Sequence, residues 1–549
     1  MKRLLILGVL PALILGSARA ATLRGVVVSD ELDGPPLSRV VIRAQGAGDA
    51  PTDGLGRFAL TIPRAKAGER IRLEIVLPGY VPVNSTQLDV TLLADETATA
   101  PTIVLTQEPI RDEMTRRFYR SACWVATLER ARLAPSNTPA NVGPSTQNFS
   151  ERDRDLALRA SGTMAVQFAN VPEAAMSTVY RSALNLFLEG QIADSLGLLA
   201  GPGLLEWPRT TESGAAQFVE ACLLKARILT TQCRFPEART AYHVATSEAP
   251  ASHSAWLGLA LFEQGAQQYE VSLQAFQRAV ALARASSRPE LIAATLVASG
   301  HIHRDQDRWD EAQKVWLEAL ALYRGSSTNA ASRHLPEVAG TLNDLATLDM
   351  DLGRVPSARA SFGEALEVLL PLEKAFPMAY SPMVAALRSN LGILSSLGGK
   401  PDDARLLFEQ ALGAQRLQTK YCPSPCCVDL ARTLFNLGLL EHRQKQLARA
   451  RAAYTEALAI YRQLAQDQPV TYTADLGDTL NNLGMLQREE RRLPEATQSL
   501  RGALAAYRAA SRNHPERFRN SIERVEARLL ELDRAATAPS SGSGAPRDQ

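Results

Sequence analysis

Small, apolar and bulky residues recur in columns that are 46 residues apart through the C-terminal half of the chain. The first column holds only small residues, at Gly300, Ala346, Gly392, Gly438 and Gly484. Three further columns keep the same step: an alanine column (Ala312, Ala358, Ala404, Ala450, Ala496), a bulky column (Trp316, Phe362, Phe408, Tyr454, Leu500) and a second alanine column (Ala319, Ala365, Ala411, Ala457, Ala503). Self-similarity of this kind predicts a solenoid of stacked helix pairs.

The predicted solenoid covers residues 176–510 as a right-handed α-solenoid of about eight helix-pair repeats. Its earlier repeats are less regular, because the alanine column there reads Ser195, Ala238 and Ser272 at shorter steps. Small residues in these columns let helix axes approach to about 8–10 Å. Residues 511–534 are predicted to form a capping helix with a charged outer face, and the Ser/Gly/Pro-rich residues 535–549 a disordered tail.

Residues 22–106 show a different pattern, with short apolar runs separated by glycine and proline. Five strands are predicted, at 26–28, 40–43, 58–62, 70–77 and 89–93. Strands at this spacing favour a small antiparallel β-sandwich. In the turn between two of them, Asp53 is expected to order the backbone with its side chain.

Residues 107–175 form a helical connector between these two regions. Helical spacing is seen from Met114 to Leu128 and again from Leu156 to Phe168. The polar stretch 136–150 is predicted to be an exposed linker. The connector shows no pattern that indicates chemistry.

Two family resemblances follow from these motifs. Trp256-Leu257-Gly258-Leu259-Ala260 with Ser272, Phe276 and Ala279 resembles the tetratricopeptide consensus, and Leu480-Asn481-Asn482-Leu483-Gly484 resembles the longer repeats of the kinesin light chain group. The segment 52–58, with Pro78-Gly79-Tyr80 after it, resembles the carboxypeptidase regulatory-like, transthyretin-like β-sandwich. The first resemblance implies a protein-binding scaffold, and the second an accessory module that is sometimes linked to glycan binding.

The N-terminus has the pattern of a cleavable secretory signal over residues 1–20. Lys2 and Arg3 precede an apolar run from Leu4 to Gly16, and Ala18-Arg19-Ala20 fits a cleavage site. Thirteen apolar residues are too few to span a bilayer, and no later segment is long and apolar enough. We therefore expect a periplasmic or secreted protein without a transmembrane segment.

The charge of the chain argues against a nucleic-acid partner. Without the three basic residues up to Arg19, the 60 basic residues fall to 57, against 58 acidic ones. A nearly neutral chain lacks the electrostatic footprint of nucleic-acid binding. We expect a protein or peptide partner, and a component of the cell envelope is among the candidates.

The six cysteines allow one candidate disulfide. Cys422-Pro-Ser-Pro-Cys426-Cys427 lies between two repeats, and an oxidising compartment permits a bond from Cys422 to Cys426 or Cys427. The spacing does not decide between these pairings and unpaired thiols. Cys222 and Cys233 are too far apart along one helix to bond, so we expect both to be buried thiols.

A ladder of polar residues is the sharpest candidate for a binding site. Asp344, Asn390, Asn436 and Asn482 stand two positions before the small column, again 46 apart, and Asn343 and Asn481 are their neighbours. In tetratricopeptide families this register faces the concave groove, and the resemblance implies contact with a partner's backbone. An amide suits that role because it both donates and accepts hydrogen bonds. The alternative is that these side chains bond within the solenoid.

Catalytic and metal motifs are missing from the sequence. The chain contains no GxSxG, no HExxH and no phosphate-binding glycine loop. His301 and His303, with Asp305 and Asp307 nearby, have ligand-like chemistry, but histidines two apart point to different helix faces. We expect no enzymatic activity, no cofactor and no metal site.

Two functions remain from the sequence. The first is an interaction scaffold that binds a partner polypeptide in the concave groove of the repeats. The second is a cell-envelope or carbohydrate-binding protein that acts through residues 22–106, with the repeats as a spacer. Deletion of the N-terminal domain separates the two.

Overall fold

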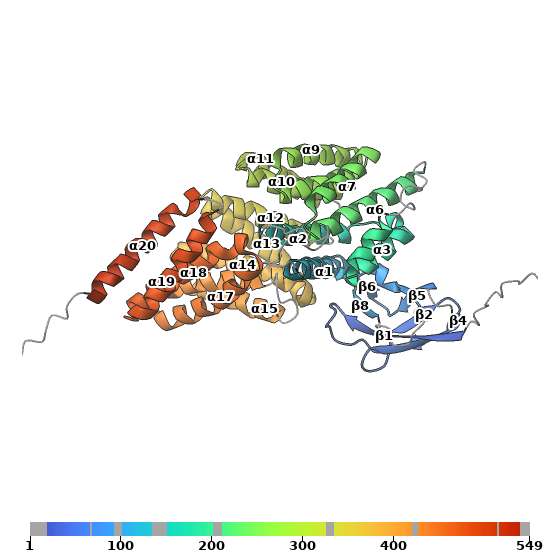
Figure 1. Ribbon diagram of the computed structural model, residues 1–549, viewed down its shortest axis with the longest axis horizontal. Coiled ribbons are helices and arrows are strands. Elements are labelled where there is room, and N and C mark those ends of the chain that lie inside the picture. Colours follow the sequence, from blue (N-terminus) through green and yellow to red (C-terminus); the bar gives the residue numbers. More distant parts are fainter. Residues whose placement is uncertain are drawn as a thin grey trace, which may run out of the picture. The chain divides into compact units, whose positions relative to one another are not determined.

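The computed structural model describes residues 19–65, 69–92, 101–133, 151–200, 211–325, 334–419, 427–512 and 515–537. It divides into two compact units, Met1–Thr115 and Arg116–Gln549 (Figure 1). The predicted leader up to residue 18, the predicted linker 136–150 and the last twelve residues of the predicted tail lie outside the described residues.

Unit 1 contains two four-stranded sheets, with strand orders β4-β1-β8-β6 and β3-β2-β5-β7. The strands are β1 (Arg19–Ser29), β2 (Val41–Ala44), β3 (Ala50–Pro51), β4 (Arg57–Ala65), β5 (Arg70–Val76), β6 (Tyr80–Pro82), β7 (Asp89–Thr91) and β8 (Thr102–Gln107), with short 3-10 helices at Ser85–Leu88 and Glu108–Ile110. Buried residues of both sheets, among them Val27, Ile42, Leu60 and Leu73, form one core. The predicted β region is confirmed: each of the five predicted strands overlaps an observed one, and β3, β6 and β8 were not predicted.

Strand pairing in unit 1 departs from the expectation at one place. β1 pairs antiparallel with β4 but parallel with β8. The alternation of side chains along a strand is the same for both directions, so the pattern does not reveal this pairing. The turn before β4 follows the expectation for Asp53, because its Oδ1 accepts hydrogen bonds from the amides of Leu55 and Arg57 at 2.9 and 2.8 Å.

Unit 2 consists of two connector helices, eight helix pairs among the described residues, and a closing helix. The connector helices are α1 (Arg111–Leu133), which begins in the last residues of unit 1, and α2 (Glu151–Ala169), followed by a 3-10 turn at Glu173–Ala175. The pairs are α3 (Thr178–Leu188) with α4 (Ile192–Leu198), α6 (Glu212–Thr231) with α7 (Phe235–Glu248), α8 (His253–Gly265) with α9 (Tyr269–Ala285), α10 (Pro289–Asp305) with α11 (Trp309–Gly325), α12 (Leu335–Asp351) with α13 (Val355–Ala375), α14 (Pro377–Leu397) with α15 (Pro401–Thr419), α16 (Cys427–Arg443) with α17 (Leu447–Asp467), and α18 (Pro469–Glu489) with α19 (Leu493–Ser511). The predicted mostly helical solenoid is confirmed.

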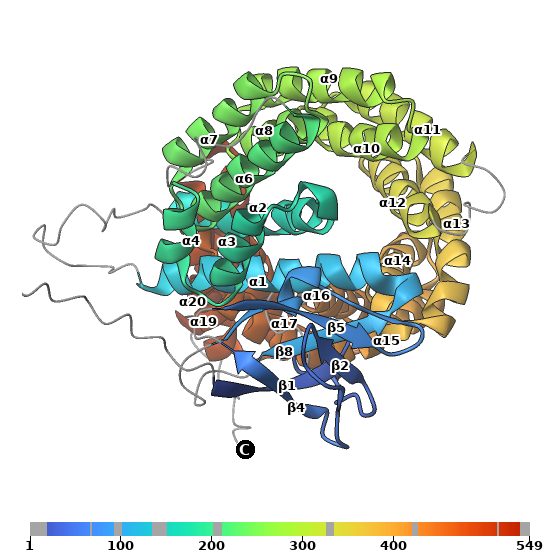
Figure 2. The ribbon, with the colours of Figure 1, turned by 90° about the vertical axis from the view of Figure 1, so that its right-hand side faces the viewer.

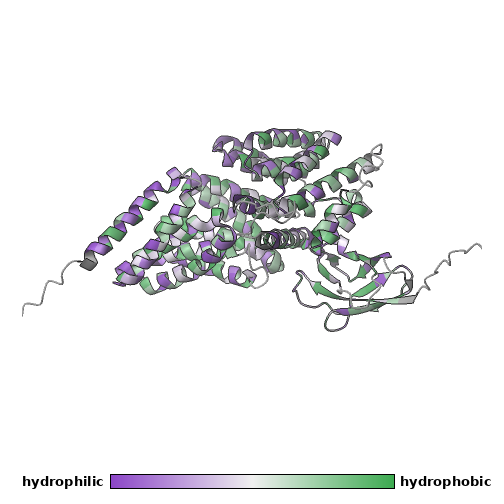
Figure 3. Ribbon diagram, viewed as in Figure 1, coloured by the Kyte–Doolittle hydropathy of each residue, from purple (hydrophilic) through white to green (hydrophobic). Residues whose placement is uncertain are grey.

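The solenoid curves with the first helix of each pair on its inner side. Figure 2 shows α8, α10 and α12 inside the curve and α9, α11 and α13 outside it. The closing helix α20 (Pro515–Thr537) buries Phe518, Val525 and Leu532, and hydrophilic residues alternate with hydrophobic ones along it in Figure 3. It continues three residues into the segment predicted to be a tail.

The columns of the sequence are the contacts that hold each pair together. The bulky side chain lies over the small residue sixteen positions earlier, so that a Cβ on Gly300 would stand 2.1 Å from Nε1 of Trp316. Tyr454 lies in the same way over Gly438, where a Cβ would stand 2.6 Å from its ring. In the alanine column, the Ser272 hydroxyl donates to the carbonyl oxygen of Ala260 at 2.7 Å. Each pair therefore depends on a close approach that only small residues allow.

We expect Gly300→Ala to destabilise the α10–α11 pair by roughly 1–3 kcal/mol, because the added methyl group overlaps the Trp316 ring in a packed core. Gly340→Ala in α12 is the matched control, since a Cβ there meets nothing within 4 Å. The control should stabilise by about 0.5–1 kcal/mol, as alanine is the better helix former. Local hydrogen exchange of α10 and α12 measures both effects. An unchanged opening free energy for Gly300→Ala would contradict the packing described here.

A column that the sequence analysis missed links neighbouring repeats. Arg359, Arg405 and Arg451 follow the alanine column directly at the same 46-residue step, and Arg239 has the same place in an earlier repeat. Arg239 and Arg405 reach buried carboxylates on the first helix of the next repeat, with Nε to Oε1 distances of 2.6 Å to Glu263 and to Glu441. Arg451 donates to Glu490 at 3.3 Å and Arg359 to Ser395 at 3.4 Å.

Candidate functional site

The polar ladder lies on the first helices of the last four pairs. Its residues are half-buried, and they come from α12 (Asn343, Asp344), α14 (Asn390), α16 (Asn436) and α18 (Asn481, Asn482). Figure 2 shows α12 on the inner side of the curve, and the later first helices continue this row, with α14 packed on α16 and α16 on α18. The role of the ladder in binding stays a hypothesis.

Several ladder side chains already have partners within the solenoid. Asn390 Nδ2 donates to Asn343 Oδ1 at 3.3 Å, and Asn481 Oδ1 accepts from Arg528 of α20 at 2.5 Å. Asn482 Nδ2 donates to the Asp478 carbonyl oxygen of its own helix at 2.8 Å. These bonds are those of the structural alternative. Among the described residues, the Asn436 side chain shows no such bond to another repeat.

Asp344 differs from the amides of the ladder because it carries charge. Its Oδ2 lies 3.5 Å from Nε2 of His301. Burial raises the pKa of Asp344, and the nearby His301 and Arg304 oppose that rise. His301 therefore contacts the ladder instead of forming a metal cluster with His303. Among the residues that the structure describes, no three His, Cys, Asp or Glu side chains are grouped to hold a metal ion.

The connector helix α2 lies inside the curve of the repeats. Figure 2 shows it inside the ring of helices, and it packs against α6 and α8 of the early repeats and against α18 of the last pair. The sequence predicted a helix over 156–168 here, but the pattern gave no reason to place it in the groove. Part of the concave surface is therefore covered by the chain itself.

The first turn of α2 contacts α18 through Asp155. Its Oδ2 accepts hydrogen bonds from the amide and the hydroxyl of Thr471, at 2.7 and 3.0 Å, and the residue is fully buried. Thr471 lies in the first turn of α18, where backbone amides have no partner within the helix. The N-cap residue Gln468 supplies no side-chain bond. Asp155 thus caps a helix that lies 316 residues away in sequence.

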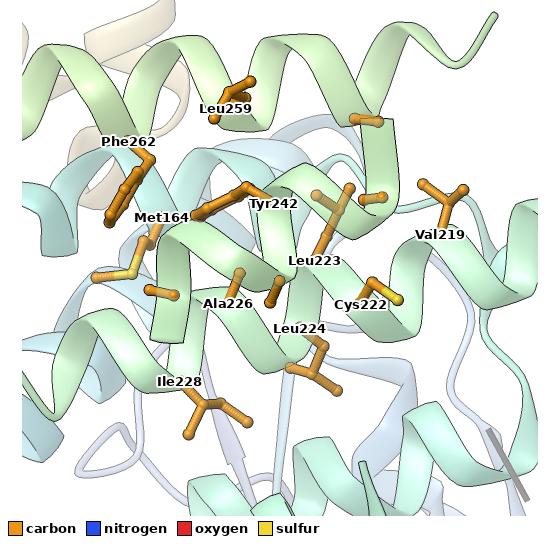
Figure 4. Close-up of a cluster of buried hydrophobic side chains, with 14 of the residues drawn as sticks. Met164, Val219, Cys222, Leu223, Leu224, Ala226, Ile228, Tyr242, Leu259 and Phe262 are labelled. Carbon is orange, nitrogen blue, oxygen red and sulfur yellow. The ribbon is translucent and has the colours of Figure 1, made fainter. Parts of the chain in front are cut away.

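The last turn of α2 is anchored in the core of the early repeats. Met164 lies among the buried side chains of α6 with Tyr242 and Phe262 (Figure 4). Gln167 accepts from Nε of Arg227 at 2.8 Å, and the Phe168 ring lies 5.4 Å from the same guanidinium. The Arg227 side chain also pairs with Glu220 at 3.6 Å, and both are almost completely buried.

The other connector helix, α1, also contacts inner helices. Nη1 of Arg116 lies 3.9 Å from Glu337 of α12, and Arg117 donates to the Met378 carbonyl oxygen of α14. The Tyr119 ring stacks on Phe168 of α2, with centroids 5.2 Å apart. The described parts of the connector, residues 116–133 and 151–169, are therefore part of the solenoid's inner surface.

Two acidic residues of α18, Asp475 and Asp478, follow Thr471, the residue that binds Asp155 of the connector. Asp475 has its pKa raised to about 6, first by burial and then by repulsion from Asp478. Asp478 accepts a hydrogen bond from the hydroxyl of Tyr507 at 2.6 Å. The charged form of the Asp475 carboxyl group is therefore energetically unfavourable near neutral pH.

Asp475→Asn should therefore stabilise α18 in a pH-dependent way. A folded-state pKa above the ordinary value means that the protonated carboxyl favours folding, and this contribution is lost as pH rises from about 4 to about 6. Above that range we expect the variant to raise the free energy of unfolding by on the order of 1–2 kcal/mol, and to change little at pH 4. Denaturant unfolding at both pH values measures this. A loss of stability at pH 7 would contradict the assignment.

The cysteine predictions have different outcomes. Cys222 and Cys233 are both buried, as expected, and burial raises the pKa of Cys233 to about 12. Cys422 and Cys426 lie outside the described residues, so the disulfide with Cys426 or Cys427 stays a prediction. No helix in the described part of the chain has the length and apolar character to cross a membrane.

Comparisons with known proteins agree with the repeat architecture. Residues 223–288 and 398–467 match one tetratricopeptide repeat model, and residues 476–516 match a second one. No curated protein matches the chain.

Several solved structures also match part of the chain. BtubC from P. vanneervenii is 21% identical, with 51% of this chain and 96% of that chain covered and a TM-score of 0.34. The putative kinesin light chain repeats of Podosopora anserina are 18% identical, with 40% and 98% covered and a TM-score of 0.32. YrrB, described as a TPR protein with an unusual peptide-binding site, is 16% identical, with 40% and 93% covered and a TM-score of 0.26.

The resemblance of unit 1 to a carboxypeptidase regulatory-like domain stays a prediction, although its two-sheet fold is established. For unit 2, the matched segments, the helix pairs and the packed columns agree. Repeats of this kind act as protein–protein interaction scaffolds and are generally not enzymes. The segments of unit 2 that these models match, residues 223–288, 398–467 and 476–516, are tetratricopeptide repeats.

Proposed function

We propose that this protein binds a partner polypeptide on the concave surface of its later repeats, α12 to α18, outside the cytoplasm. The observation that carries the proposal is the ladder of polar side chains on four successive inner helices. Side-chain amides along a groove suit contact with a peptide backbone, which offers the same donors and acceptors at every residue. The leader pattern of residues 1–20 supports the location.

Asn436 and Asn482 are the ladder positions that test the proposal best. Their amides make no side-chain bond to another repeat among the described residues, whereas Asn390 bonds to Asn343 and Asn481 to Arg528. Replacing Asn436 and Asn482 therefore removes two side-chain amides from the groove with little effect on the packing of the repeats. Asn520→Ala, at an exposed position of α20, is the matched control.

The experiment is affinity capture from envelope extract, followed by a binding measurement with the captured partner. We expect Asn436→Ala/Asn482→Ala to weaken binding by about tenfold or more, since two or more hydrogen bonds are lost, while the control binds like the wild type. Helical content should be equal in all three. Equal capture by all three proteins would contradict binding of the partner in the groove.

Deletion of residues 22–106 distinguishes the alternative reading. If a partner binds the repeats, capture survives the deletion; if the β-sandwich binds an envelope component or carbohydrate, capture is lost. Mass spectrometry of the mature N-terminus tests the location, because the leader pattern predicts a chain that begins at Ala21.

A further inference from the structure

The helix α2 is tied to the early repeats and to the last pair, but by contacts of different kinds. Its C-terminal half is held by buried apolar side chains, with Met164 and Phe168 only 2% and 1% exposed, in the same cluster as α6. Its first turn reaches α18 through Asp155, and the Arg154 side chain donates to the carbonyl oxygen of Gln466, just before α18, at 3.3 Å.

These two attachments differ in strength. The apolar one removes whole side chains from water and is shared by several helices, so it opens only when the early repeats unfold. The polar one consists of a few hydrogen bonds, for which water offers substitutes once the contact opens. Asp155 also has an unsatisfied polar atom, because its Oδ1 is buried and has no hydrogen-bond partner among the described residues. This raises the free energy of the closed contact. The contact with α18 is therefore the weaker of the two.

We propose that α2 is a clasp that holds the early repeats and the last pair together and keeps the concave surface of the solenoid closed. It opens at the Asp155–Thr471 contact, while the Phe168 end stays fixed to α6. Asn481 and Asn482 lie on the same helix, about three helical turns from Thr471, so opening releases the start of the helix that carries the end of the ladder. A groove of this kind has a closed and an open state, and anything that binds only the open state shifts the population towards it.

The closed state also explains a local feature of α18. A helix whose N-cap residue makes no side-chain bond leaves its first amides to water or to a neighbour. Here the neighbour is a carboxylate, the group that a helix N-terminus favours most. When the clasp opens, the first turn of α18 loses its cap, so opening is visible as faster exchange of the Thr471 amide.

The test compares the full-length mature protein with Asp155→Ala and with Asp310→Ala. Asp310 is an exposed carboxylate in the first turn of α11, so the control removes the same group from a helix that does not touch α2. Two quantities are measured: hydrogen exchange of the first turn of α18, and the distance between two spin labels at the exposed positions Val244 in α7 and Arg501 in α19. Labels carried by non-natural amino acids leave the native cysteines unchanged.

We expect Asp155→Ala to speed exchange at Thr471 by about tenfold or more and to lengthen the distance between the labels, with α6 protected as in the wild type. Thr471→Val, which keeps the backbone amide and loses the hydroxyl, should give a smaller change in the same direction. Faster exchange without a longer distance would overturn the proposal, because Asp155 would then be only a local cap. Unchanged exchange and distance in both variants would overturn it as well. The test needs no partner, so it stands apart from the proposed function.

Discussion

Arg227→Met is expected to lower the free energy of unfolding of the early repeats by about 3–5 kcal/mol. The change leaves the Glu220 carboxylate buried without its partner 3.6 Å away, since both side chains are almost completely excluded from water. It also removes the hydrogen bond to Gln167 and the contact with the Phe168 ring, so α2 loses its polar anchor. Hydrogen exchange of α6 is the suitable measurement, because long repeat arrays need not unfold in one step.

The double variant Arg227→Met/Glu220→Leu is the control for this prediction. Replacing both members of a buried ion pair by apolar groups is often neutral, so the double variant should recover at least half of the loss. Arg416→Met removes an exposed pair with Glu456 and should cost less than about 1 kcal/mol. If the double variant were less stable than Arg227→Met alone, the loss would come from packing and the charge argument would be wrong.

Trp316→Ala should destabilise the α10–α11 pair by about 3–5 kcal/mol. The side chain is fully buried, its ring covers Gly300, and its Nε1 donates to the Val297 carbonyl oxygen at 3.1 Å. Truncation leaves a large cavity between the two helices that the array closes only in part. Thermal unfolding and local exchange of α10 measure the effect.

The neighbouring Leu317 offers the matched control, because it is 51% exposed on the other side of the same helix. Leu317→Ala should change stability by no more than about 0.5 kcal/mol, as surface substitutions usually do. Equal losses for the two variants would mean that the bulky column does not hold the pair together.

The parts of the fold that repeat could be predicted from the sequence. A small residue and a bulky residue sixteen positions later, such as Gly300 and Trp316, recur five times at steps of 46. The sequence therefore indicates the contact that the structure shows between them. The Ser272 hydroxyl is accommodated in the alanine column for the same reason, since a small side chain fits there and the Ala260 carbonyl oxygen is near. The column that includes Arg405 had the same signal and could have been found by the same search.

The contacts made by α2 could not be predicted in this way. Asp155 and Thr471 are 316 residues apart, and neither belongs to a periodic column. An acidic residue near the start of a helix usually serves that helix, so its pattern gives no sign of a cap on another one. The curvature that brings α18 back to α2 arises from small rotations between pairs, which add up along the array. The parallel pairing of β1 with β8 is likewise a matter of topology.

These findings change the picture of the ladder. The amides of Asn390 and Asn343 bond to each other, and that pair follows the structural alternative. Asn436 shows no bond to another repeat among the described residues, and Asn482 bonds to Asp478 within α18, the helix that Asp155 caps. The proposed binding surface and the proposed clasp therefore share α18, and each can be tested by a separate substitution.

The measurement that tests this account most directly is the affinity of the captured partner for three proteins: wild type, Asp155→Ala and Asn436→Ala/Asn482→Ala. If α2 closes the groove and the ladder lines it, Asp155→Ala should bind the partner more tightly, because its open state is already populated. The ladder variant should bind more weakly. The same affinity for all three would contradict the account, since neither the groove nor its clasp would then take part in recognition.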